Sequence, residues 1–220
     1  MKQVSLVTSA LRRVCPQGLL LAGLILTSVT GLQAAITSNQ TGTNNGFYYS
    51  LWHSTGSVSM TLGSAGNYAL SWSSIGDVTA GKGWNPGSAR TVNYNCSTFN
   101  GGKVLAVYGW TTSPLIEYYV CEMGSVASGT QVGTVSSDGH TYTVYKHQQV
   151  NQPSIQGTAT FWQYLSNWGG ASKGANHSVT TGNHFNYWKA HIGSMGSFNY
   201  MIMVTEAWGG GSGNSNVTVW

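Results

Sequence analysis

Short stretches of alternating hydrophobic and polar residues recur along this chain, and turn-forming residues separate them. Alternation with a period of two is typical of strands that bury one face, while glycine, serine and asparagine between them favour tight turns. The 30 glycines indicate the same structure, because glycine weakens helices and suits turns and bulges. The sequence therefore predicts an all-β fold. The expected strands are Ser57–Leu62, Tyr68–Ser73, Thr91–Tyr94, Val104–Trp110, Ile116–Glu122, Thr141–Tyr145, Thr160–Leu165, Tyr200–Glu206 and Val217–Trp220.

One segment has the spacing of a helix instead. Phe185, Trp188 and Ile192 recur at intervals of three and four residues within the stretch 183–192. The Thr-Thr-Gly-Asn start of this segment offers side chains that can cap a helix. We therefore expect a single helix that packs on a sheet.

Residues 1–34 have the pattern of a secretory signal peptide. Basic residues precede the apolar stretch Leu19–Leu26, and Ala34 supplies a small residue at the expected cleavage site. The apolar stretch is too short to anchor the product, and no later stretch approaches the ~20 apolar residues of a membrane helix. We expect a secreted, extracellular protein with no membrane segment, whose residues 35–220 form one domain.

Few side chains in the chain carry a charge. Three of the nine Lys and Arg residues fall within the predicted signal peptide, so six remain against five Asp and Glu, and the net charge is near +1. The six are scattered, without the cationic stripe that a nucleic-acid backbone requires. Nucleic acid is therefore not an expected partner. A nearly uncharged surface rich in hydroxyl, amide and aromatic side chains suits a neutral ligand such as a sugar polymer, and we expect a monomer.

Cysteine and histidine form no pattern typical of a metal site. The six histidines are dispersed, and no Cys-x-x-Cys or His-x-x-x-His spacing occurs, so we expect no metal and no cofactor. Cys96 and Cys121 remain after signal cleavage. An oxidising compartment permits a disulfide between them, and two separate buried thiols fit the sequence equally well.

Carboxylic acids are rare in this chain. The five are Asp77, Glu117, Glu122, Asp138 and Glu206. Glu117 and Glu206 interrupt strand-like runs crowded with aromatic residues, where a carboxylate is otherwise an improbable choice. Glycoside hydrolysis needs two carboxyls beside the scissile bond, one to deliver a proton and one to attack or to activate water. We interpret Glu117 and Glu206 as this pair, and Glu122 and Asp138 as structural, Asp138 within a Ser-Asp-Gly turn.

Strand alternation indicates that the two acids share one surface with aromatic side chains. Three expected strands each carry two such residues at positions of the same parity, namely Tyr108 with Trp110, Glu117 with Tyr119, and Tyr200 with Glu206. Aromatic rings stack on sugar rings, and carboxyls transfer protons. The sequence therefore predicts a sugar-cleaving groove.

Five segments resemble, in order, the motifs of the glycoside hydrolase family 11 endo-xylanases. They are GKGWNPGS (81–88), VYGWTTSPLIEYYV (107–120), NQPSIQGTATFWQY (151–164), NHFNYW (183–188) and VTEAW (204–208). The resemblance extends from about Asn44 to Trp220. It implies a jelly-roll sandwich of two curved antiparallel sheets with one helix and a substrate cleft. It also implies an enzyme that cuts internal β-1,4 bonds of xylan with retention of configuration.

The resemblance implies a role for several residues of this chain. Glu117 in PLIEYY matches the nucleophile, and Glu206 in VTEAW matches the acid/base. The expected substrate-binding residues, with Trp110 added from the aromatic face, are Trp52, Tyr108, Trp110, Tyr119, Pro153, Ser154, Ile155, Gln163 and Tyr200. Pro153 to Ile155 match the tip of a mobile hairpin, the thumb, and the turn-forming stretch 151–154 also predicts a loop.

Asp77 matches a position where the family has either Asn or Asp beside the acid/base. A hydrogen bond between Asp77 and Glu206 would couple their titrations, because two carboxyls would compete for one proton. The resemblance then implies an acidic pH optimum that Asp77 sets. The alternative is a strand-end turn residue that caps its own backbone.

Two positions depart from the family pattern. Gln149 stands where the family usually has an arginine before the thumb motif, and Thr112 stands where many members have an arginine after Gly-Trp-Thr. Both changes remove a cation near the cleft, which bears on substrate affinity and on the electrostatic support of Glu117.

A non-catalytic carbohydrate-binding jelly roll is the alternative function. Such a module would also be exported, aromatic and poor in charge. It would not require Glu117 and Glu206 together, so release of reducing sugar from xylan separates the two functions.

Overall fold

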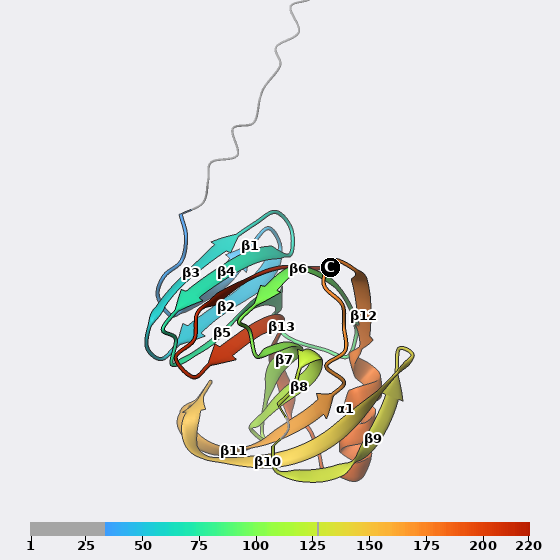
Figure 1. Cartoon of the computed structure of the whole chain (residues 1–220). Coiled ribbons are helices and arrows are strands. Elements are labelled where there is room, and N and C mark those ends of the chain that lie inside the picture. The colour runs from blue at the N-terminus through green and yellow to red at the C-terminus, as the bar shows by residue number, and fades with distance from the viewer. Residues whose placement is uncertain (1–33, 127) are drawn as a thin grey trace, which may run out of the picture. The chain divides into compact units, whose positions relative to one another are not determined.

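A computed structural model describes residues 34–126 and 128–220 of the chain. The predicted signal peptide, residues 1–34, lies outside the described residues except for Ala34. The described part contains fourteen strands and one helix (Figure 1). They are β1 (Gln40–Asn44), β2 (Phe47–His53), β3 (Ser57–Leu62), β4 (Asn67–Ser73), β5 (Asp77–Trp84), β6 (Thr91–Asn100), β7 (Val104–Thr112), β8 (Ile116–Gly124), β9 (Thr130–Ser137), β10 (His140–Ser154), β11 (Gly157–Asn167), β12 (Asn176–Thr180), α1 (Thr181–His191), β13 (Ser197–Trp208) and β14 (Gly213–Val219).

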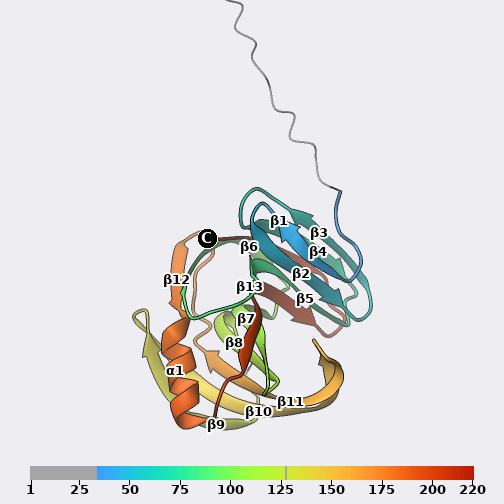
Figure 2. The same cartoon turned by 180° about the vertical axis from the view of Figure 1, so that it is seen from behind.

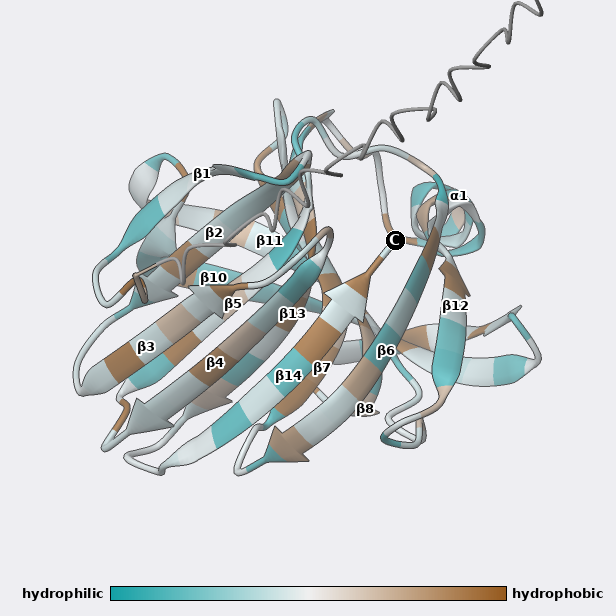
Figure 3. Cartoon of the chain, turned by 90° about the horizontal axis from the view of Figure 1, so that it is seen from above, coloured by the Kyte–Doolittle hydropathy of each residue, from teal (hydrophilic) through white to brown (hydrophobic). Residues whose placement is uncertain are grey.

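The strands form two sheets. The larger has the order β1-β2-β5-β13-β7-β8-β11-β10-β9, and the smaller has the order β12-β6-β14-β4-β3. Figure 3 shows the five strands of the smaller sheet side by side, with bands of hydrophobic and hydrophilic residues along them. The predicted all-β jelly-roll fold is confirmed, with one correction to the antiparallel pattern, because β8 and β11 run parallel.

The main hydrophobic core lies between the sheets. On β3, for example, Val58, Met60 and Leu62 are buried while the residues between them are more exposed, as a period of two requires. Tyr68 of β4 and Trp188 of α1 add large buried rings to this core. Burying each such side chain contributes up to about 3 kcal/mol, which holds the two sheets together.

The central strands β7 and β8 are buried on both faces. Leu105 and Val107 enter the core between the sheets, whereas Ala106 and Tyr108 belong to a second apolar cluster on the opposite, concave face. The side chains that face the cleft therefore stand on strands that packing holds from both sides.

The two cysteines that remain in the described chain are buried free thiols. Cys96 of β6 belongs to the core between the sheets, and Cys121 of β8 belongs to the cluster on the concave face. The larger sheet thus separates them. Of the two alternatives, separate buried thiols is the correct one.

The helix begins two residues and ends one residue earlier than the sequence predicts, at Thr181–His191 instead of 183–192. Phe185 and Trp188 are buried, as their spacing indicates. The expectation of a side-chain cap is wrong, because the hydroxyl of the N-cap residue Thr180 donates to Asp138 and makes no capping bond. Within the described ranges, no helix is long and apolar enough to span a membrane.

All nine predicted strand segments fall in strands, apart from Trp220, because β14 ends at Val219. The sequence did not predict β1, β2, β5, β9 and β12. In β5 the alternation is broken by Gly81 and Gly83, and a Cβ at either would overlap a backbone carbonyl of β13. The glycines allow β5 to approach β13 closely, which a hydrophobicity pattern does not reveal.

The hairpin of β10 and β11 extends further than the sequence predicts. The stretch 151–154 is the end of β10 and not a loop, and the turn occupies residues 155 and 156. A bulge between Gln149 and Gln152 places Asn151 at φ 53° and bends the hairpin. Figures 1 and 2 both show the hairpin end curling back toward β5.

Candidate active site

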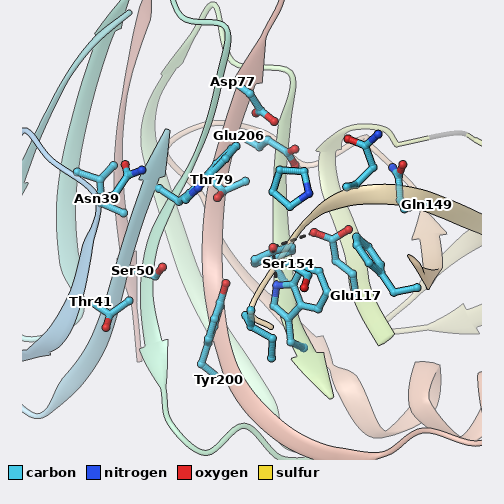
Figure 4. Close-up of a pocket in the computed structure, with 18 of the residues that line it drawn as sticks. Asn39, Thr41, Ser50, Asp77, Thr79, Glu117, Gln149, Ser154, Tyr200 and Glu206 are labelled. Carbon is cyan, nitrogen blue, oxygen red and sulfur yellow. Dashed lines mark hydrogen bonds between the residues drawn. The ribbon is translucent and has the colours of Figure 1, made fainter. Parts of the chain in front are cut away.

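A cleft with a volume of about 460 Å³ lies on the concave face of the larger sheet. Its floor comes from β5, β13, β7 and β8, and the β10–β11 hairpin closes one side (Figure 4). All twelve residues predicted for the site line this cleft: Trp52, Asp77, Tyr108, Trp110, Glu117, Tyr119, Pro153, Ser154, Ile155, Gln163, Tyr200 and Glu206. The alternation of β7, β8 and β13 brings six of them to one face, and β2, β5, β11 and the β10–β11 hairpin supply the other six.

Glu117 is buried, with 7% of its surface exposed, and neutral groups hold both of its carboxyl oxygens. The hydroxyls of Tyr108 and Tyr119 donate to Oε1 over 2.8 Å and 3.2 Å. The Nε2 of Gln163 donates to Oε2 over 2.7 Å, because Gln163 lies directly opposite Glu117 in the β8–β11 pair. Burial raises the pKa of Glu117 to about 7, and the three hydrogen bonds limit this rise because they stabilise the ionised form.

A chain of hydrogen bonds fixes the orientation of Glu117. The indole Nε1 of Trp110 donates to the hydroxyl of Tyr108 over 2.7 Å, so that the tyrosine hydrogen points to the carboxylate. Trp110 also packs edge-on against Phe161, with ring centroids 4.8 Å apart. The carboxyl is thus held by side chains that are themselves held in place.

Glu206 lies on β13 with 9% of its surface exposed, opposite Thr79 of β5. Burial raises its pKa well above the ordinary value, the negative charges of Asp77 and Glu117 raise it further, and a hydrogen bond with Tyr119 lowers it. Its Oε2 is buried without a hydrogen-bond partner. The arrangement favours a protonated Glu206 beside an ionisable Glu117, which suits one proton donor and one nucleophile.

Asp77 begins β5 and pairs with Trp208, at the end of β13 that carries Glu206. Figure 4 shows Asp77 and Glu206 close together at the top of the view. Asp77 Oδ1 and Glu206 Oε2 are both buried without a hydrogen-bond partner. Burial raises the pKa of Asp77 to about 6, partly offset by a hydrogen bond from the backbone of Val78. The two carboxyls interact through charge.

Among the described residues that line the cleft are three carboxylic acids and no lysine or arginine. Gln149, where the family usually has an arginine, is one of the lining residues. Thr112, the other departure, ends β7 beside Ser197 and does not line the cleft. Of the two departures, only Gln149 lies among the residues of the cleft.

The thumb tip forms a closed turn at the rim. The hydroxyl of Ser154 donates to the carbonyl of Gly157 over 2.6 Å and accepts from the backbone of Gln156 over 3.0 Å. Pro153 and Ile155 line the cleft from this hairpin, and Trp52, which is half-buried, lines it from β2. The cleft thus has both aromatic and aliphatic surfaces.

Further lining residues were not predicted. They are Asn39, Gln40, Thr41, Ser50, Leu51, Thr79, Gln152 and Phe161. Two of them stand two residues from a predicted residue on the same strand: Ser50 from Trp52, and Thr79 from Asp77. Strand alternation is therefore a signal that could have found them. Asn39 to Thr41 have no such signal, because β1 is short and polar.

The remaining acids serve the fold, as the sequence predicts. Glu122 is buried between the sheets and accepts hydrogen bonds from Tyr94 and Tyr142 over 2.9 Å and 2.8 Å. Asp138 lies in the β9–β10 turn with φ 54° and accepts from the backbone and hydroxyl of Thr180. Neither lines the cleft.

Residues 44–218 match the family model described as "Glycosyl hydrolases family 11". The "Endo-1,4-beta-xylanase 2" of Rhizopus oryzae is 52% identical over 192 residues, which cover 84% of this chain and 87% of that protein. The "Ethylene-inducing xylanase" of Penicillium digitatum is 50% identical over 191 residues, 84% of this chain and 87% of that protein. The "Endo-1,4-beta-xylanase Xyn11B" of Cellvibrio japonicus is 45% identical over 213 residues, 90% of this chain and 58% of that protein. With this match over most of its length, the chain belongs to glycosyl hydrolase family 11.

Proposed function

We propose that the protein is an endo-1,4-β-xylanase that hydrolyses internal bonds of xylan by double displacement. The observation that carries this proposal is the cleft itself, in which Glu117 and Glu206 are both buried beside aromatic rings. The names of the relatives indicate the substrate. The protein acts as a monomer in this proposal.

Glu117 and Glu206 divide the chemistry between them. In the first step the Glu117 carboxylate bonds to the anomeric carbon, the bond to the bridging oxygen breaks, and Glu206 gives its proton to that oxygen. In the second step Glu206 takes a proton from water, whose oxygen attacks the anomeric carbon and releases Glu117. The raised pKa of Glu206 supports its role as the donor, and the hydrogen bonds on Glu117 support ionisation.

Aromatic and amide side chains bind the sugar chain in this proposal. Trp52 and the thumb residue Pro153 offer apolar surfaces to the cleft, and Tyr200 lies on its floor. Such surfaces bury the faces of sugar rings, while neighbouring amides and hydroxyls bind the ring hydroxyls.

Release of reducing sugar from xylan and from cellulose, measured side by side, tests the function. We expect hydrolysis of xylan and none of cellulose. Binding to xylan without release of reducing sugar would favour the non-catalytic module instead.

We further propose that residues 1–34 direct export and are removed. The basic and apolar pattern of this segment supports the proposal. Mass spectrometry of the protein recovered from the culture medium should give an N-terminus near Ala35, and retention of Met1 would contradict it.

Asp77→Asn is expected to raise the pH optimum on xylan. Activity needs a protonated Glu206, and Asp77 begins to ionise near its pKa of about 6. Above that pH the proton left on the pair is attracted by two carboxyls and is less available to the leaving oxygen. An asparagine does not titrate, so the proton belongs to Glu206 alone, and burial and the charge of Glu117 still hold the pKa of Glu206 above its ordinary value once the charge of Asp77 is gone.

The pH profile of kcat/KM for the parent and the variant measures this shift. Asp138→Asn, the same change in a turn outside the cleft, is the matched control and should leave the optimum unchanged. A lowered pH optimum in Asp77→Asn would mean that Asp77 acts only by raising the pKa of Glu206. An unchanged pH optimum would mean that Asp77 does not govern the acid/base. Either result would contradict the prediction.

A further inference from the structure

A second hollow, with a volume of about 550 Å³, lies beyond the Tyr200 end of the cleft. Tyr48 lines this hollow, and its ring centroid is 5.3 Å from that of Tyr200, which lines the cleft. Trp84, another lining residue, pairs with Met201, the residue after Tyr200. Figure 4 shows Tyr200 at the bottom of the view, at the opposite end of the cleft from Asp77. A sugar chain that fills the cleft can therefore reach the second hollow.

The hollow contains an oriented arginine. The guanidinium of Arg90 lies 4.2 Å from the ring centroid of Trp84, and its Nε and Nη2 both donate to the hydroxyl of Ser88, over 3.1 Å and 3.0 Å. The indole supports one face of the guanidinium, and the serine fixes the direction of one edge. Because arginine stays protonated at any working pH, the hollow carries a fixed positive charge.

None of the five acidic side chains, all within the described part of the chain, forms a salt bridge with Arg90. Three of these acids line the main cleft, Glu122 is bound by tyrosines in the core, and Asp138 is bound at the start of α1. Arg90 is partly exposed and bonded to a neutral hydroxyl. Its charge is available to an anion that enters the hollow.

The surroundings of Arg90 select the kind of anion. A guanidinium fork matches the planar geometry of a carboxylate. Tyr48 and Trp84 add aromatic surface, and the hydroxyl of Thr43 adds a polar group, which together suit a sugar ring. The main cleft has the opposite character, since its carboxyls repel an anionic group. An acidic sugar is therefore favoured at the second hollow and disfavoured in the cleft.

We propose that this hollow binds a uronic acid that branches from a xylan chain whose backbone occupies the cleft. The carboxylate of the branch pairs with Arg90, and its ring contacts Tyr48. This inference rests on the proposed function and names a class of substrate for it, namely xylan with acidic branches.

The test compares two ligands on three proteins by isothermal titration calorimetry. The ligands are an unbranched xylo-oligosaccharide and the same oligosaccharide with one glucuronic acid branch. The proteins are Glu117→Gln, which prevents cleavage, and the same variant with Arg90→Gln or Arg90→Lys. We expect Arg90→Gln to weaken binding of the branched ligand by roughly three- to tenfold, the range of a partly exposed charged hydrogen bond, and Arg90→Lys to restore part of it. Binding of the unbranched ligand should not change.

Salt provides a second measurement that needs no change at Arg90. Raising the salt concentration should weaken binding of the branched ligand to Glu117→Gln more than binding of the unbranched one, because salt screens an exposed charge pair. Equal losses for both ligands in Arg90→Gln, or no loss for the branched ligand, would overturn the proposal. Hydrolysis of xylan by the unmodified protein is assayed separately, so failure of the proposed function would be seen there and not in these affinities.

Discussion

Glu117→Gln is expected to reduce turnover on xylan by on the order of 10⁴-fold or more while the fold is retained. An amide does not attack the anomeric carbon, so the first step of the double displacement is lost. The substitution conserves shape, and glutamine can still bond with Tyr108 and Tyr119. Initial rates of reducing-sugar release measure the loss, and thermal unfolding checks the fold.

Glu122→Gln is the matched control for this variant. Glu122 stands on the same strand as Glu117, is also buried, and also accepts hydrogen bonds from two tyrosine hydroxyls. It does not line the cleft, so turnover by the folded variant should remain near that of the parent. Near-parental turnover by Glu117→Gln would remove this residue from the mechanism.

Glu206→Gln is expected to cause a comparable loss on xylan and a much smaller loss on an activated aryl xyloside. The bridging oxygen of xylan is a poor leaving group that needs the Glu206 proton, whereas a phenolate with electron-withdrawing groups departs with little protonation. Formation of the glycosyl-enzyme is then partly independent of Glu206. Its hydrolysis still lacks the base that activates water, so an initial burst followed by slow turnover should appear.

The readout is the ratio of the activity of Glu206→Gln on the aryl xyloside to its activity on xylan. A rapid-mixing assay of phenolate release measures the burst, and reducing-sugar release measures turnover on xylan. A structural role for Glu206 would lower both activities by the same factor, and that result would contradict its assignment as the acid/base.

The placement of the acids could be predicted because the strands that carry them are regular. The register shifts of β7, β8 and β13 lie away from Tyr108, Glu117 and Glu206, so parity alone assigns these side chains to one face. The family motifs add Gln163, which reaches Glu117 because β11 pairs with β8 in a register that places the two residues opposite each other. Strand pairing of this kind joins segments far apart in sequence and leaves no local pattern.

Other features depend on tertiary contacts that the local sequence does not encode. Thr180 could cap the helix that follows it, but Asp138, 42 residues earlier in the chain, binds its hydroxyl instead. The sequence did not predict β5 because Gly81 and Gly83, which allow β13 to approach closely, are not typical strand residues. The second hollow is built from turns and strand ends around Arg90, whose lack of a carboxylate partner is visible only once every acid has been placed.

The central claim is that Glu117 attacks the sugar directly, and the anomeric configuration of the first product tests it most directly. Carboxyls about 5 to 5.5 Å apart suit direct attack and retention, whereas a larger separation leaves room for water and gives inversion. Proton NMR during the first minutes of xylo-oligosaccharide hydrolysis resolves the two anomers before they interconvert. We predict that the β-anomer is released first and that the α-anomer appears only later by mutarotation. Initial release of the α-anomer would contradict the double displacement.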